Sequence, residues 1–170
     1  MSGTGNGVAP RFLAKLALGY ALLMGLYFLV PDDWLLAAYH QAIVVPGAAL
    51  VRLVAPGALV TADHNVLRSP GVALEIVRGC DGTGVLFMLH AAVLAWPATW
   101  RRRWAALGGA TAFVYVLNLA RVVALYFVAV RRPAWFEAAH TLYVPGLFVV
   151  AALAFFDLWA RRRGTADALA

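Results

Sequence analysis

Four apolar stretches set the main constraint on this chain, because each is long enough to cross a lipid bilayer as a helix. They are residues 12–30, 83–100, 104–130 and 141–160. A helix rises about 1.5 Å per residue, so roughly 20 residues cross a hydrocarbon core of about 30 Å. With 64% hydrophobic and 13% charged residues among 170, the chain is too apolar for a soluble domain of this length. We therefore expect an all-α integral membrane protein with about four transmembrane helices.

A single membrane-embedded domain is expected over residues 11–163, between two cytoplasmic tails. Residues 1–10 are rich in Gly, Ser and Thr and predict a disordered tail, and residues 164–170 form the second tail. Arg11 and Lys15 stand at the first apolar run, as in a signal peptide. The sequence Pro31-Asp32-Asp33-Trp34 follows it instead of a small-residue cleavage site, which favours a retained anchor.

The segment 34–59 is apolar but interrupted. It carries polar side chains at His40, Gln41 and Arg52, and it contains Pro46-Gly47 and Pro56-Gly57. These features predict an amphipathic or re-entrant segment on the outer face. If the segment crossed the membrane instead, the orientation of everything after it would invert.

A short β-hairpin is predicted directly before the only cysteine. Val72, Leu74 and Ile76 alternate with Ala73, Glu75 and Val77, and Ser69-Pro70-Gly71 supplies a turn. The hairpin leads the chain into Gly79-Cys80-Asp81-Gly82 at the start of the second apolar run.

The basic residues predict the orientation. Arg11 and Lys15, the triple Arg at 101–103 and the triple Arg at 161–163 all become cytoplasmic if four spans leave both termini inside. Arg131 and Arg132 fall outside in this arrangement. Because the Arg clusters flank apolar runs, the net charge of +6 indicates membrane topology and contact with lipid headgroups, and we expect no nucleic-acid partner.

Cys80 is the first candidate for chemistry. A single cysteine excludes an internal disulfide, an iron–sulfur cluster and a Cys-rich zinc site, and we expect no metal and no cofactor. A lone cysteine in an apolar chain is often a small buried hydrophobe. At a helix start, however, the dipole and a nearby Arg favour the reactive thiolate.

Arg121 and His140 are the candidate partners. Arg121 lies about ten residues before Arg131, roughly 13–15 Å below the outer surface if the helix is regular, where an Arg is costly unless paired. Asn118 is one turn away and is expected to brace the guanidinium. His140 begins the fourth apolar run at the outer face, where it could act as an acid and base. Arg121 could stabilise either the thiolate or an oxyanion, and these two roles remain open.

These residues resemble the motifs of the exosortase/archaeosortase family, in its compact, exosortase H-like form. The resemblance rests on Glu75-Ile76-Val77-Arg78-Gly79-Cys80-Asp81-Gly82, on Asn118-Leu119-Ala120-Arg121 and on the downstream His140, and it covers roughly residues 60–160. It implies a membrane-embedded cysteine protease or transpeptidase of the cytoplasmic (inner) membrane of a prokaryote, with its active site facing the exterior. Its partners would be exported proteins that carry a C-terminal sorting signal of short motif, transmembrane helix and basic tail.

The resemblance also implies the roles of individual residues. Cys80 would be the nucleophile, Arg121 the electrostatic stabiliser and His140 the acid/base, with Asn118, Asp81 and Gly82 in support. Asp81 stands where the family usually has Ser. A carboxylate beside a thiol disfavours the thiolate unless it caps the helix or pairs with an Arg such as Arg78.

Two other functions remain as alternatives. A haem-binding module would use His90 with His140 or His40, although His90 is in mid-span and His140 is near the surface. An anion-binding or transport module would use Arg121 to hold the anion, and the substitution Cys80→Ala would then have no effect on function.

Overall fold

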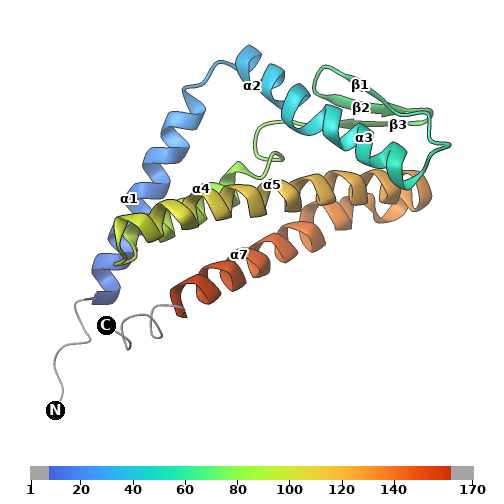
Figure 1. The fold of residues 1–170 in the computed structure, drawn as a ribbon. Helices are drawn as coiled ribbons and strands as arrows, with labels where there is room; N and C mark the ends of the chain where they lie inside the picture. The colour runs from blue at the N-terminus through green and yellow to red at the C-terminus, as the bar shows by residue number, and fades with distance from the viewer. Residues whose placement is uncertain (1–7, 162–170) are drawn as a thin grey trace. The chain divides into compact units, whose positions relative to one another are not determined.

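The computed structural model describes residues 8–161, which form seven α-helices, two π-helical segments, one 3₁₀ turn and a small sheet (Figure 1). In chain order the elements are α1 (Val8–Phe28), α2 (Asp32–Tyr39), the π-helical η1 (His40–Val44), α3 (Val45–Val54), β1 (Thr61–Asp63), β2 (Val66–Ser69), β3 (Val72–Glu75), α4 (Thr83–Ala95), α5 (Trp100–Arg131), the 3₁₀ turn η2 (Pro133–Trp135), α6 (Phe136–Ala138), the π-helical η3 (Ala139–Tyr143) and α7 (Val144–Arg161).

Helix α1 starts earlier than expected. Val8–Pro10 are helical, although the sequence predicted a disordered tail over residues 1–10. Pro10 lies in the first turn, where a missing N–H removes no helical hydrogen bond. The rest of that tail, and the tail predicted at 164–170, lie outside the described residues.

The predicted class is confirmed. Four helical segments within residues 8–161 are long and apolar enough to cross a membrane, namely Pro10–Phe28, Asp32–Val54, Trp100–Arg131 and Pro133–Arg161. Leucines such as Leu18 and Leu22 on α1 and Leu153 on α7 are exposed, as lipid-facing side chains are. The chain is a multi-pass, mainly helical membrane protein.

The segments that meet this length differ from those expected. The segment expected to break at Pro46-Gly47 is a continuous helix from Asp32 to Val54. In η1 the N–H of Val45 donates to the carbonyl of His40, five residues back, so a new helical turn begins just before Pro46. A proline in a first turn removes no hydrogen bond, which is why it does not end the helix.

The second predicted span is shorter than expected. Helix α4 has 13 residues, about 20 Å at 1.5 Å per residue, and Trp96-Pro97-Ala98-Thr99 then leave the helix. Pro97 accounts for this end, because the residue before a proline is pushed out of helical geometry. The remainder of residues 83–100 is non-helical until α5 begins at Trp100.

Two compact units make up the chain. The first contains the described residues 8–29, 84–114 and 149–161, and the second contains residues 30–83 and 115–148. In the first, Leu89 of α4, Ala110 and Val114 of α5 and Ala152 of α7 form a small buried cluster.

The second unit is built around the sheet. The predicted hairpin is confirmed as β2–β3, turned at Pro70-Gly71 with a positive φ of 79° at Gly71. Strand β1 extends the sheet to three antiparallel strands in the order β1-β2-β3. Leu67 of β2 is completely buried and belongs to the core of this unit. The other buried members of that core are Tyr39, Ile43, Val44, Ala48, Val51, Val60, Ile76, Val122 and Tyr126.

Candidate active site

Cys80 lies in a tight loop between β3 and α4. The N–H of Cys80 donates to the carbonyl of Val77 at 2.9 Å. Gly79 and Gly82 flank the loop with positive φ angles of 88° and 81°. Residues other than glycine rarely adopt this backbone conformation. The glycines therefore allow the chain to turn twice within a few residues and present the cysteine just before the helix.

Asp81 caps helix α4. Its Oδ1 accepts hydrogen bonds from the backbone N–H of Thr83 at 3.2 Å and from the hydroxyl of Thr83 at 2.7 Å. Its Oδ2 accepts the hydroxyl of Tyr39 at 2.9 Å, and the residue is only 8% exposed. Both carboxylate oxygens accept hydrogen bonds, and the bond from the N–H of Thr83 satisfies a backbone donor in the first turn of α4. Asp81 therefore caps the helix, which is one of the two arrangements expected for an Asp in place of Ser.

Arg78 bonds to the segment between α1 and α2. Its guanidinium donates to the carbonyl of Val30 at 2.8 Å and to a carboxylate oxygen of Asp32 at 2.6 Å. These bonds join the loop before Cys80 to the beginning of α2.

His140 lies beside the thiol. Its Nε2 is 3.4 Å from Sγ of Cys80, across 60 residues of sequence. The imidazole lies parallel to the ring of Phe136, with 5.7 Å between centroids and 4° between planes. His140 belongs to η3, and π-helical turns are frequent at functional sites. The geometry allows a proton to pass between sulfur and imidazole.

Arg121 approaches the same loop from α5. One guanidinium nitrogen donates to the backbone carbonyl of Cys80 at 3.2 Å, and the guanidinium carbon is 5.7 Å from the centroid of Phe148. Helix α5 continues without a break to Arg131, ten residues after Arg121, as the expected depth assumed. The depth of Arg121 in the membrane stays a prediction.

Asn118 contacts Gly82 rather than Arg121. Asn118 is only 3% exposed. A Cβ atom added to Gly82 would lie 3.3 Å from the side-chain amide carbon of Asn118, so the two residues are close neighbours. Within residues 8–161 no hydrogen bond joins Asn118 to Arg121, and the Oδ1 atom of Asn118 has no partner there. The expected brace is therefore not seen, and the amide lies against the cysteine loop instead.

A cavity of about 300 Å³ opens beside these residues. Cys80, Arg121 and His140 all line it, and so does a continuous stretch of the hairpin. The remaining lining residues are Ala73, Leu74, Glu75, Ile76, Val77, Val122, Leu125 and Phe136. A thiol, an imidazole and a guanidinium thus converge on one partly apolar space, which suits covalent chemistry on a carbonyl.

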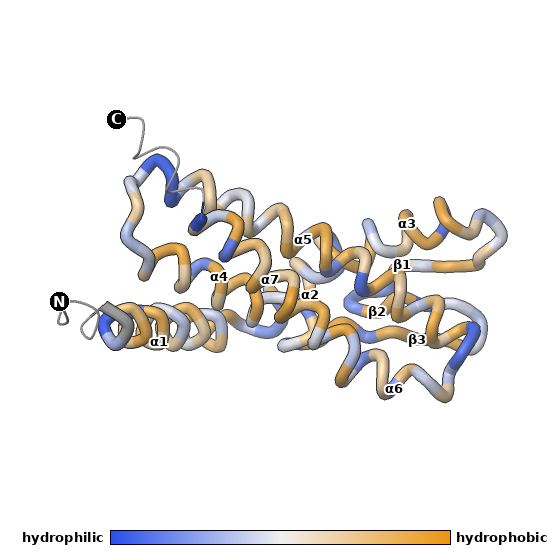
Figure 2. The backbone as a smooth tube through the Cα atoms, turned by 90° about the horizontal axis from the view of Figure 1, so that it is seen from below, coloured by the Kyte–Doolittle hydropathy of each residue, from blue (hydrophilic) through white to orange (hydrophobic). Residues whose placement is uncertain are grey.

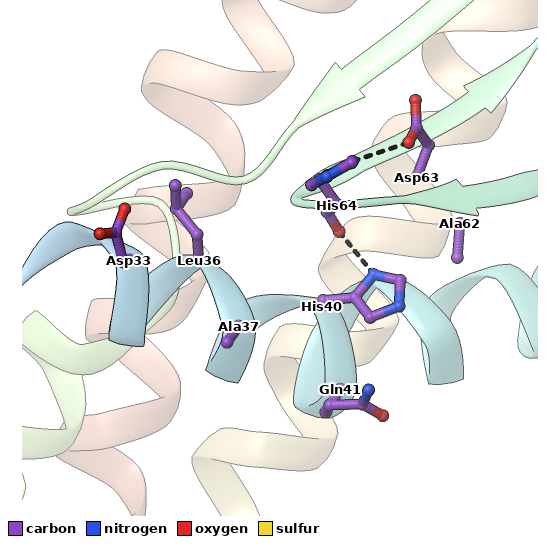
Figure 3. Close-up of a pocket in the computed structure, with 8 residues that line it drawn as sticks. All are labelled: Asp33, Leu36, Ala37, His40, Gln41, Ala62, Asp63 and His64. Atoms are coloured by element: carbon purple, nitrogen blue, oxygen red, sulfur yellow. Dashed lines mark hydrogen bonds and ion pairs between the residues drawn. The ribbon is translucent and has the colours of Figure 1, made fainter.

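A second cavity of about 560 Å³ in the same unit is lined by His40, His64, Asp63 and Asp33 with neighbouring residues (Figure 3). Nδ1 of His40 lies 2.7 Å from the carbonyl of His64, and Nδ1 of His64 lies 2.9 Å from Asp63. His40 and His140 line different cavities of this unit. His90, in the first unit, is bound to the carbonyl of Leu107 and the hydroxyl of Thr111.

Tyr39 was not predicted from the sequence. It is 42 residues from Asp81, and no local pattern around an apolar helix end marks it as a partner. The two π-helical turns, in contrast, share a sequence motif. Each is followed by Val-Pro-Gly, at Val45-Pro46-Gly47 after η1 and at Val144-Pro145-Gly146 after η3.

The comparison with protein families found one match over most of the chain. A family model described as transmembrane exosortase matches residues 8–157. Searches of the curated proteins and of the solved structures found no match.

Proposed function

The chain belongs to the transmembrane exosortase family, and on that premise we propose that it is a cysteine protease or transpeptidase for exported proteins. Its substrates carry a C-terminal sorting signal made of a short motif, a transmembrane helix and a basic tail. The enzyme cleaves near the motif and releases the helix.

The contact of 3.4 Å between Sγ of Cys80 and Nε2 of His140 carries the proposal. His140 takes the thiol proton, and the thiolate attacks the carbonyl carbon of the scissile peptide bond. When the tetrahedral intermediate collapses, the C–N bond breaks and His140 gives its proton to the leaving amine. The acyl-enzyme is a thioester at Cys80. Water or an amine then attacks the thioester carbon, and His140 takes the proton of that nucleophile. The C–S bond breaks, the acyl product leaves, and the proton returns from His140 to the thiolate of Cys80.

Arg121 stabilises negative charge in this scheme. Its bond to the carbonyl of Cys80 fixes the guanidinium against the loop, and the residue lines the cavity. A guanidinium has five N–H donors, so donors remain for the oxyanion of the tetrahedral intermediate. Asn118, Asp81 and Gly82 support the loop that carries the nucleophile.

Two contacts support a site on the outer face of the cytoplasmic membrane. Arg78 reaches Val30, so the chain leaves α1 and arrives at Cys80 on one side of the membrane. Residues 61–75 form an open sheet, and an open sheet does not cross lipid. Because Val30 and Arg78 lie on the same side of the membrane, the helical segment Asp32–Val54 between them makes no net crossing. Cys80 also contacts His140 beyond α5, so if α5 crosses once, residues 83–100 cross back despite the short helix. The triple Arg clusters then remain cytoplasmic.

The test is co-expression with an exported reporter that ends in a short motif, an apolar helix and an Arg-rich tail. We expect the wild type to remove the tail and Cys80→Ala to leave it intact. Normal processing by Cys80→Ala would refute the mechanism. Because Cys80 is the only cysteine, a thiol reagent that cannot cross membranes reports its side directly. Labelling in intact cells supports the outer face, and labelling only after permeabilisation reverses the topology.

A further inference from the structure

Strand β3 is an edge strand, and its free edge runs along the cavity that contains Cys80. The sheet order places β2 on one side of β3, and no strand lies on the other side within the part of the chain that the structure describes. Figure 2 shows β3 with β2 on one side and α6 on the other. Phe136 of α6 and residues of β3 line the same cavity.

The residues that line the cavity show that it lies along the edge of the sheet rather than over one of its faces. Side chains of a strand alternate between two faces, so a cavity on one face is lined by every second residue. Here five consecutive residues, 73–77, line the cavity. The cavity therefore follows the backbone of β3 and its extension toward Cys80.

The hydrogen-bond register identifies the free backbone groups. The N–H of Ile76 donates to the carbonyl of Asn65 at 2.8 Å, so Ile76 bonds toward β2. In an antiparallel ladder the bonded residues alternate, so Leu74 and Val72 also bond toward β2. The N–H and C=O groups of Ala73 and Glu75 therefore point away from β2, along the free edge.

We propose that the segment of the substrate preceding the scissile bond binds as a fourth strand on the free edge of β3. This inference rests on the proposed function. An added strand obtains affinity from backbone hydrogen bonds, and neighbouring pockets select side chains. Val122, Leu125 and Phe136 provide apolar lining for such a side chain. Many different exported proteins can therefore be held through a short common motif.

The membrane fixes the direction of this strand. The transmembrane helix of the substrate follows the scissile bond and lies in lipid, whereas an open sheet edge does not. The residues beside the sheet are therefore those that precede the scissile bond, and they run toward Cys80. Strand β3 also runs toward Cys80, so the pairing is parallel. One substrate residue then donates to the carbonyl of Ala73 and accepts from the N–H of Glu75.

A proline at position 73 tests the proposal. Ala73→Pro removes the outward N–H and places a ring on the free edge, but it leaves the bonds to β2 intact. We expect processing of the tailed reporter to fall at least fivefold. Ala73→Val keeps the N–H, so it should lose less processing than Ala73→Pro does.

The opposite edge of the sheet supplies a matched control. Ala62 of β1 pairs with Leu67, whose backbone bonds toward β3, so the N–H of Ala62 also points outward. Ala62→Pro removes an equivalent group far from Cys80 along the sheet order and should process normally. Equal thiol labelling of Cys80 in all variants shows that the loop is intact.

Disulfide trapping provides a second measurement that does not need cleavage. In the Glu75→Cys, Cys80→Ala protein, single cysteines are placed at successive positions of the reporter before its helix. A paired strand predicts cross-links at alternate positions. Normal processing by Ala73→Pro, or cross-linking without alternation, would overturn the fourth strand while the proposed function stands. Processing by Cys80→Ala would instead overturn the proposed function.

Discussion

The hydroxyl of Tyr39 donates a 2.9 Å hydrogen bond to Oδ2 of Asp81, joining the end of α2 to the residue after the cysteine. Both side chains are buried, at 5% and 8% exposure. A hydrogen bond to a charged group contributes about 1.5–3 kcal/mol. We therefore expect Tyr39→Phe to lower the free energy of unfolding by about that amount and to alter the rate of Cys80 alkylation. Thermal unfolding in detergent measures the first effect. Tyr143→Phe is the control, because Tyr143 is 58% exposed.

The contact between Gly82 and Asn118 predicts a cost for any side chain at Gly82. Gly82→Ala forces an L-residue into a left-handed conformation, at about 1–2 kcal/mol, and also presses Cβ against Asn118. Gly71→Ala has the same backbone penalty with open space around the new methyl group. We expect Gly82→Ala to reduce the unfolding midpoint more than Gly71→Ala does. Equal losses would mean that the Asn118 contact is not important.

His140 is expected to be required for processing. Its loss leaves the thiol without a proton acceptor, so His140→Ala should reduce reporter cleavage at least a hundredfold. The matched control is His40→Ala, which changes the same residue type in the other π-helical turn. Immunoblots of the reporter measure both. Cleavage by His140→Ala at the wild-type rate would exclude its role.

Arg121 is expected to act through geometry as well as charge. Arg121→Lys keeps the charge but loses the planar set of donors that reaches the carbonyl of Cys80. We expect cleavage to fall at least tenfold in Arg121→Lys and further in Arg121→Gln. Arg131→Lys, at the exposed end of the same helix, should be unchanged.

Acid should loosen the turn between β1 and β2. Hydrogen bonds from His64, and then from Arg68, lower the pKa of Asp63 below its ordinary value of 3.8. The ionised carboxylate therefore contributes stability that is fully present above that value and is lost as the pH falls through the lowered pKa. We expect amide exchange at Val66 and Arg68 to accelerate below about pH 3.8. In Asp63→Asn this acid step should disappear.

The elements predicted correctly from the sequence are those whose structure is determined by local residue patterns. Alternation and a Pro-Gly turn predicted β2–β3, and long apolar runs predicted α1, α5 and α7. Strand β1 has only three residues, too few for a visible alternation. The continuity of Asp32–Val54 was missed because a π-helical turn accommodates Pro46.

The convergence of the candidate site could be anticipated only in part. The predicted topology placed Cys80 and His140 at the outer face with Arg121 below them, and the structure brings all three to one cavity. Their catalytic roles stay predictions. The contacts of Tyr39 with Asp81 and of Arg78 with Val30 depend on tertiary packing across more than 40 residues, which no local pattern records.

The π-helical turn at Ala139–Tyr143 makes the length of this segment as important as its composition. A π-helical turn is what remains when one residue is inserted into an α-helix. Deleting one residue from 141–143 would restore the regular ladder and rotate His140 by about 100° relative to the residues that follow. The proton acceptor would then be lost although every residue named in the site is still present. Mutagenesis by substitution would not detect this constraint, and among related chains an alignment gap at this point would signal a different active site.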